Sequence, residues 1–156
     1  MVHGPCPWSM VHGLWSMVDV QCPRSIFKPY RQKSPPTPMP FKFEQLDIWK
    51  LAIEFADEVH LLTRGFPKEE LFSLTSQFKR AADSVSLNIA EGSIGQSDAE
   101  QKKFVGYSIR SLAECVNCLY LSNRRNYISH EEFAKLYKRS ETLFAKLNRF
   151  RRSLGG

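Results

Sequence analysis

The chain has 156 residues, of which 42% are hydrophobic and 24% charged, and these values are typical of a single globular domain. Its 22 basic and 16 acidic residues give a net charge of +6, which permits anionic partners without requiring them. Because the sequence has four cysteines and no apolar run of about 18 residues, it predicts neither a disulfide scaffold nor a membrane-spanning helix.

Residues 1–40 differ in composition from the rest of the chain. They hold eight of the nine prolines, and proline lacks a backbone donor and fixes φ, so neither helix nor central strand is expected there. We predict a disordered N-terminal extension over 1–40, followed by one domain at 41–156. The abrupt change in composition suggests an alternative, in which translation starts at Met39. The intact mass of the native protein would distinguish the two.

The first predicted helix spans residues 45–64, where apolar side chains recur at spacings of three and four. They form one stripe made of Ile48, Ala52, Phe55, Val59 and Leu62. Gly65 is expected to adopt the left-handed conformation that ends a helix. Pro67 is then expected to open a short turn through 68–70, since proline is tolerated at a first helical position.

The second predicted helix spans about 74–93. Its apolar stripe consists of Leu74, Phe78, Ala81 or Ala82, Val85 and Ile89. The small residues on this helix would allow another helix to approach closely. Gly92 and Gly95 are expected to interrupt the helical pattern.

Two capping boxes predict the starts of the third and fourth helices, at Ser97 with Glu100 and at Ser129 with Glu132. The third helix is expected to continue to about Asn126, with inward residues Phe104, Tyr107 or Ser108, Leu112, Val116 and Leu119. The fourth has heptad spacing along Leu136, Ser140, Leu143, Leu147, Phe150 and Leu154.

No segment alternates apolar and polar residues for long enough to predict a strand. Four helices with short connections must pack against their neighbours in the sequence. The predicted fold class is therefore all-α, as an antiparallel up-down-up-down four-helix bundle with a disordered N-terminal extension.

Candidate catalytic and metal-ligating residues are sparse. Asp57 and His60 have the acid-x-x-His spacing of a di-metal bundle site, but a second such pair is missing, so a surface role is favoured. Cys115 and Cys118 have CxxC spacing but are expected in mid-helix, where small buried hydrophobic residues are the better interpretation. We predict no enzymatic activity, no cofactor and no metal site.

Basic residues cluster on three of the predicted helices. Cations near helix C-termini are favoured by the helix dipole alone, which accounts for several arginines without any ligand. The alternative is phosphate binding, which requires a contiguous basic surface. The residues predicted to bind nucleic acid are Lys79, Arg80, Lys135, Lys138, Arg139 and Arg149.

The segment around Asn88, Glu91 and Gly92 places polar groups beside an apolar stripe. A polar group on a buried face must find a partner. We expect Asn88 and Glu91 to cap or cross-link neighbouring helices, and a contact between subunits is the alternative.

The chain resembles, over about residues 41–150, the four-helix bundle family encoded by intervening sequences in bacterial 23S rRNA genes. The resemblance includes Trp49, Ala52, Leu62-Thr63 and Phe66-Pro67 upstream. Its main part comprises Arg80-Ala81-Ala82, Ser84-Val85, Asn88-Ile89-Ala90-Glu91-Gly92, Ser97, Glu100, Phe104 and Ser111-Leu112-Ala113-Glu114. Arg110 stands where many members have glycine.

The resemblance implies a four-helix bundle and a ring-shaped homopentamer. A similar bundle, the accessory variability protein of diversity-generating retroelements, binds a reverse transcriptase and nucleic acid through basic surfaces. The resemblance therefore implies a non-enzymatic homo-oligomer that binds RNA, a ribonucleoprotein or a reverse transcriptase-like protein. A cytoplasmic location is expected because the sequence has no signal for an oxidising compartment, so the cysteines should be reduced. A protein-interaction scaffold without nucleic-acid binding is the alternative, and a metal-dependent bundle enzyme is disfavoured.

Overall fold

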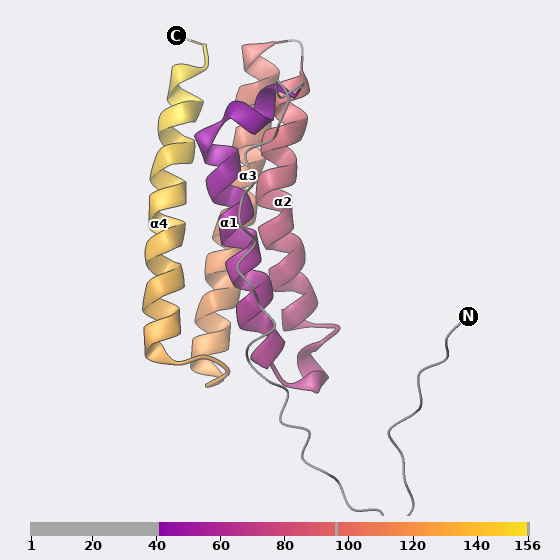
Figure 1. The fold of residues 1–156 in the computed structure, drawn as a ribbon, viewed down its shortest axis with the longest axis vertical. Helices are drawn as coiled ribbons and strands as arrows, with labels where there is room; N and C mark the ends of the chain where they lie inside the picture. The colour runs from indigo at the N-terminus through magenta and orange to yellow at the C-terminus, as the bar shows by residue number, and fades with distance from the viewer. Residues whose placement is uncertain (1–40, 96, 156) are drawn as a thin grey trace, which may run out of the picture. The chain divides into compact units, whose positions relative to one another are not determined.

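The computed structural model describes residues 41–95 and 97–155, and the predictions for 1–40, including the start at Met39, concern residues outside these ranges. The described residues form four long helices and contain no strand, which confirms the predicted fold class for this part of the chain (Figure 1). The helices are α1 (Asp47–Leu62), α2 (Leu74–Ile94), α3 (Asp98–Arg124) and α4 (His130–Ser153). Three short 3-10 turns flank α1, namely η1 (Lys42–Gln45), η2 (Thr63–Gly65) and η3 (Lys68–Glu70).

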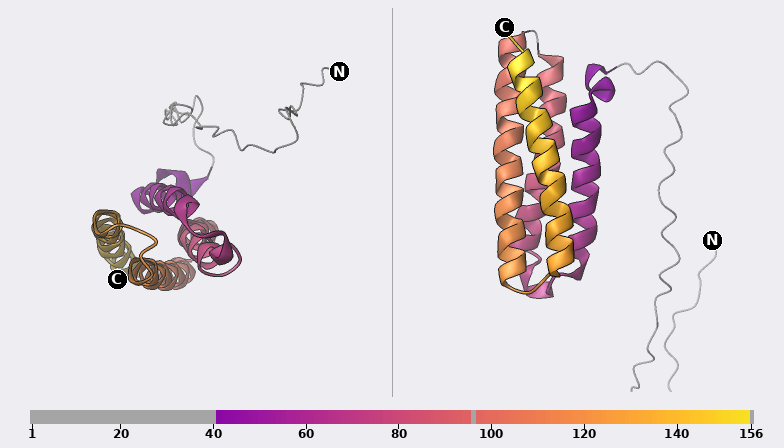
Figure 2. Two further views of the ribbon diagram at one scale, coloured as in Figure 1. Left: turned by 90° about the horizontal axis from the view of Figure 1, so that it is seen from below. Right: turned by 90° about the vertical axis from the view of Figure 1, so that its left-hand side faces the viewer.

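Consecutive helices run antiparallel, as short connections require. Each helix packs on two others: α1 lies beside α2 and α4, and α3 lies beside α2 and α4. Seen along the bundle axis, the four helices form a ring with α2 and α4 at opposite corners (Figure 2). As a result, the start of α3 and the end of α4 lie at the same end of the bundle (Figure 1).

The core is built from the stripes predicted for the first, second and fourth helices. On α1, four of the five predicted residues are buried, and Leu62 is half-buried. On α2 every predicted stripe residue is buried, with Phe78 and Val85 completely enclosed. On α4 all are buried except Phe150, which is half-buried. Helical periodicity thus locates the buried faces of these three helices.

On α3 the predicted inward residues Leu112 and Leu119 are buried, but two other predicted positions were wrong by one residue. Phe104 and Val116 are only partly buried, whereas their neighbours Val105 and Cys115 are completely enclosed. Ser108, and not Tyr107, lies between them on the buried side. A shift of one residue turns a helical face by about 100°. The stripe was hard to locate because α3 buries several small or polar residues, namely Gln101, Ser108 and Ser122.

The serine caps occur where the sequence predicts them. The Ser129 hydroxyl accepts from the backbone N–H of Glu132 at 3.1 Å, and the Glu132 carboxylate accepts from the backbone N–H of Ser129 at 2.8 Å. This completes the second predicted box. The Ser97 hydroxyl accepts from the Glu100 N–H at 3.3 Å. The reciprocal bond is absent there, so the first box is only half formed.

Two predictions about glycines were wrong. Gly65 is not left-handed, because α1 ends through the 3-10 turn η2. Gly92 does not interrupt α2, which continues to Ile94. A Cβ at Gly92 would lie 2.6 Å from the Cβ of Phe104 on α3. The missing side chain therefore allows α2 and α3 to approach closely, as in other helix pairs that pack through small residues.

Glu70 links the turn before α2 to the connection between α3 and α4. Its carboxylate accepts from Arg125 at 2.8 Å and from the Tyr127 hydroxyl at 3.0 Å, and also from Ser73. The hydrogen bond from Ser73 is the main cause that lowers the pKa of Glu70. Any stability gained from this lowered pKa is present above the ordinary carboxyl pKa and is lost as the pH falls.

The two cysteines of α3 are free and buried. Burial raises the pKa of both thiols, that of Cys118 to about 11. The contribution of a neutral buried thiol to stability is fully present below the ordinary thiol pKa of about 8.5. It is lost as the pH rises through the pKa of the folded state.

We expect iodoacetamide at about pH 8 to leave Cys115 and Cys118 unmodified in the native protein, because the thiolate is the reactive form. Peptide mapping by mass spectrometry checks this, with a sample unfolded in urea as the positive control. Rapid alkylation of both native cysteines would contradict the burial described here.

Candidate nucleic-acid interface

The structure divides the six predicted nucleic-acid-binding residues between two helices. Lys79 and Arg80 are on α2, and the other four are on α4. Because α2 and α4 occupy opposite corners of the ring, the two groups do not form one continuous surface (Figure 2). Phosphate binding by the complete set would require a ligand that reaches around the bundle.

Arg139 and Lys138 have acidic partners. The Arg139 guanidinium donates to the Glu58 carboxylate at 2.8 Å from Nε and 2.6 Å from Nη2, and it lies 3.4 Å from Glu54. The hydrogen bond to Glu58 is the main cause that raises the pKa of Arg139. Lys138 pairs with Glu141 at 3.3 Å. Arg139 therefore joins α4 to α1, and neither cation presents an isolated positive charge.

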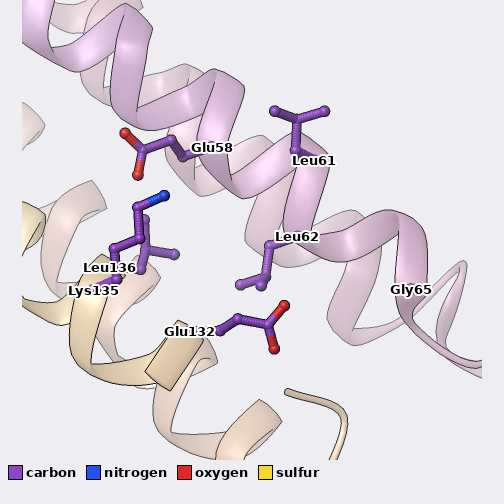
Figure 3. A pocket seen from close by; sticks show the side chains of 7 residues that line it. All are labelled: Glu58, Leu61, Leu62, Gly65, Glu132, Lys135 and Leu136. Atoms are coloured by element: carbon purple, nitrogen blue, oxygen red, sulfur yellow. The ribbon is translucent and has the colours of Figure 1, made fainter. Parts of the chain in front are cut away.

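Lys135 lines a pocket of about 410 Å³ between the end of α1 and the start of α4. It shares this pocket with two carboxylates, Glu58 and Glu132, and with apolar side chains (Figure 3). The lining residues include no hydroxyl, thiol or imidazole group that could act as a nucleophile or general base beside these carboxylates. Since Glu58 is already paired with Arg139, Glu132 balances Lys135, and the pocket has no net positive charge to attract phosphate.

The opposite end of the α3–α4 pair has a different charge. Residues 101–113 and 142–156 contain no Asp or Glu, and the antiparallel packing of α3 and α4 brings the two segments to the same end of the bundle (Figure 1). Together they carry seven cations, which we call the basic end: Lys102, Lys103, Arg110, Lys146, Arg149, Arg151 and Arg152. The rest of residues 41–156 has 11 basic and 15 acidic residues, so the positive charge is strongly localised.

Two contacts show how the basic end is arranged. The Arg151 guanidinium of α4 lies over Gly106 of α3, since a Cβ at Gly106 would be 3.7 Å from Arg151 Cζ. On α3, Lys103 Nζ and Arg110 Cζ lie 5.9 Å and 5.8 Å from the centre of the Tyr107 ring. Such distances are typical of cation–π contacts. Arg151, Lys103 and Arg110 form none of the ion pairs found among the described residues.

Arg149 is the member of the predicted set that belongs to the basic end. With Lys146, it lines a pocket of about 470 Å³ between α4 and the start of α1, which also includes Asp47. Sequence reasoning missed Lys146 on α4 and Lys102, Lys103 and Arg110 on α3. The missing signal was the absence of acidic residues over 101–113, which becomes informative only once this segment is known to lie beside the end of α4.

Asn88 takes part in a polar contact between α2 and α3. Its side-chain amide donates to the backbone carbonyl of Ser84 at 2.7 Å and to the Ser84 hydroxyl at 3.0 Å. The Ser111 hydroxyl of α3 bonds the same Ser84 hydroxyl at 3.1 Å. Asn88 therefore reaches α3 through Ser84, whereas Glu91 is exposed. Gly92 is buried against Phe104 of α3.

His60 was expected as a surface residue; its side chain is 41% exposed, and it also contacts α2. Its Nε2 lies 3.0 Å and 3.2 Å from the two carboxylate oxygens of Asp83. Among the described residues, no three His, Cys, Asp or Glu side chains are grouped so that they could hold a metal ion. The pair therefore joins α1 to α2.

None of the helices in residues 41–95 and 97–155 is long and apolar enough to cross a lipid bilayer.

Comparisons with known proteins agree with this architecture. A crystal structure of a protein of unknown function from the S23 ribosomal protein family of Bacteroides thetaiotaomicron superposes with a TM-score of 0.63 at 22% sequence identity. The superposition covers 68% of this chain and 96% of that one, which supports the fold. No curated protein matches the chain. Residues 44–149 match the family described as 23S rRNA-intervening sequence protein, so the chain belongs to this family.

Proposed function

We propose that this protein is a non-enzymatic, cytoplasmic homo-oligomer that binds RNA, free or within a ribonucleoprotein, through the basic end. The observation that carries this proposal is the set of seven cations on two adjacent helix segments without an acidic residue. Clustered lysines and arginines attract a polyanion and release its counterions on binding. Family membership supports a connection with RNA, and the pentamer is proposed from the family resemblance alone.

Salt dependence of RNA binding tests the proposal. We expect the full chain to bind a fluorescent RNA at low salt, with an affinity that falls linearly on a log–log plot as salt rises. The double variant Arg110→Gln/Arg151→Gln should weaken binding and reduce the slope by roughly 1 for each lost phosphate contact. Anisotropy titrations at several salt concentrations measure both quantities, and light scattering gives the oligomer mass.

The matched control is Lys79→Gln/Arg80→Gln, which removes the same charge from α2. Near wild-type affinity in this variant would assign binding to the basic end. A larger loss than in the α3–α4 variant would instead favour the surface predicted from the sequence. If the wild-type protein binds no RNA at low salt, the proposed function is wrong.

A protein-interaction scaffold without nucleic-acid binding is the second candidate. It is favoured by large apolar side chains that are exposed on α2 and on the turn just before it. Phe72, Leu87 and Ile94 have relative exposures of 91%, 64% and 67%. This function predicts a protein partner, such as a reverse transcriptase-like protein, that remains bound after nuclease treatment and is lost in Leu87→Ser/Ile94→Ser.

A further inference from the structure

The outer edge between α3 and α4 continues from the basic end toward a group of exposed aromatic rings. Arg151 lies against Gly106 at one end, and Tyr137 lies 6.0 Å from Tyr120 at the other, measured between ring centres. On α3 the sequence spacing from Gly106 to Tyr120 is 14 residues, and on α4 that from Tyr137 to Arg151 is also 14. A spacing of 14 residues is two heptads, and positions seven residues apart lie on nearly the same side of a helix. The residue midway between the two contacts on each helix therefore lies on the same edge.

The intermediate residues are Ala113 on α3 and Phe144 on α4. Because the helices are antiparallel, Phe144 is placed across from Ala113, whose small side chain leaves the ring uncovered. Phe144 and Tyr120 are each 50% exposed. We call this line the α3–α4 seam, and it consists of Gly106, Ala113, Tyr120, Tyr137, Phe144 and Arg151.

Further rings extend the aromatic end of the seam. Phe133 stacks on Tyr137 with ring centres 5.7 Å apart and planes at 15°, and His130 stacks on Phe133 at 6.4 Å and 16°. Tyr120 meets the Phe133 ring edge-on at 5.1 Å. His130 and Tyr120 are exposed. The result is a short ladder of rings that ends in solvent.

Acidic residues border the seam without neutralising its basic end. Asp98 and Glu100 precede the acid-free segment of α3, and Glu114 follows it. Glu114 accepts from Gln77 of α2 at 3.1 Å, and Glu141 of α4 pairs with Lys138. On α3, Lys103 and Arg110 lie about one helical turn to either side of Gly106 and flank the Tyr107 ring.

We infer that the α3–α4 seam binds single-stranded RNA, with phosphates at the basic end and unpaired bases stacked on the exposed rings. This inference rests on the proposed function and adds the class of ligand. Aromatic and arginine groups beside a cationic surface bind unpaired bases, because each base has a face that can stack. In a duplex those faces are already stacked, so the rings would contact only the sugar–phosphate backbone.

The length of the seam defines the probe. From Lys103 to Tyr120 the helix extends about 25 Å at its usual rise of about 1.5 Å per residue. A fluorescent single-stranded oligouridylate of about twelve nucleotides lies within the roughly 4–16 nucleotides that compact single-strand sites cover. A blunt RNA duplex of about twelve base pairs is the comparison ligand.

The decisive variant is Tyr120→Leu/Phe144→Leu, which keeps apolar bulk and charge while removing two exposed rings. We expect it to weaken binding of the single strand at least about tenfold, which corresponds to ~1.4 kcal/mol. The salt slope should remain that of the wild type, because no cation is lost. Duplex affinity should not change. Circular dichroism of the variant checks that the bundle is intact.

The matched control is Leu87→Ala/Ile94→Ala, which removes two exposed apolar side chains from α2 and should leave single-strand affinity unchanged. Equal wild-type affinity for single strand and duplex, or unchanged single-strand affinity in the Tyr120/Phe144 variant, would overturn the inference while RNA binding itself remained. A change in oligomer mass in that variant would show that the seam is a contact between copies, which also overturns it. Absence of any RNA binding would remove the proposed function as well.

Discussion

Truncation of Phe78 to alanine is expected to lower the free energy of unfolding by about 3–5 kcal/mol. The ring lies on α2 and has no solvent exposure. Alanine would lose the transfer free energy of the ring and leave a cavity that the neighbouring helices could fill only in part. Because small domains have total stabilities of about 5–15 kcal/mol, this loss is a large share of the whole. Urea denaturation followed by circular dichroism measures it.

Phe72 provides a control of the same chemical type. It lies just before α2 and is 91% exposed, so Phe72→Ala removes almost no buried surface. Its free energy of unfolding should stay within about 0.5 kcal/mol of the wild type. Comparable losses in the two variants would mean that burial does not distinguish the two rings, contrary to the packing described above.

Replacement of Gly92 by alanine is expected to destabilise the protein by about 1–3 kcal/mol, although alanine is the better helix former. The added Cβ would meet the Cβ of Phe104 at 2.6 Å, a position that depends on the α3 backbone. Rotation of the Phe104 side chain cannot relieve this contact, so α2 and α3 must separate. Thermal unfolding at several urea concentrations provides the free-energy difference.

Gly65 offers the matched substitution. A Cβ at this position would have no neighbour within 4 Å, and its φ is not in the left-handed region. Gly65→Ala is therefore expected to be neutral or to stabilise the protein by up to about 1 kcal/mol, since it restricts the unfolded chain. If Gly92→Ala were as well tolerated as Gly65→Ala, the close approach of α2 and α3 would not be required for stability.

Local sequence patterns were sufficient for most of the fold. The stripes through Phe55, Phe78 and Leu143 located the buried faces of α1, α2 and α4, because a helix repeats every 3.6 residues whatever it packs against. The cap at Ser129 was equally clear, since both of its hydrogen bonds connect residues three apart. Two positions on the face of α3 were placed wrongly because its buried side includes Gln101 and Ser108, which no apolar pattern identifies.

The glycines show the limit of local reasoning. Gly65 and Gly92 both suggest helix ends by composition, yet one lies in a 3-10 turn and the other inside α2. Gly92 lies inside the helix at a point where Phe104 of α3 packs against it, and local sequence rules cannot predict this contact between helices.

The sequence by itself determined four helices, their order and most of their buried faces, because these depend on contacts between residues a few positions apart. Only the tertiary structure decided which cations are neutralised. Arg139 meets Glu54 and Glu58, which are 85 and 81 positions away in the chain, because α4 packs on α1. Likewise, the cation-rich segments around Arg110 and Arg151 come to the same end of the bundle because α3 and α4 pack antiparallel. Charge interactions depend on distance in space, and that distance is fixed by which helices are neighbours.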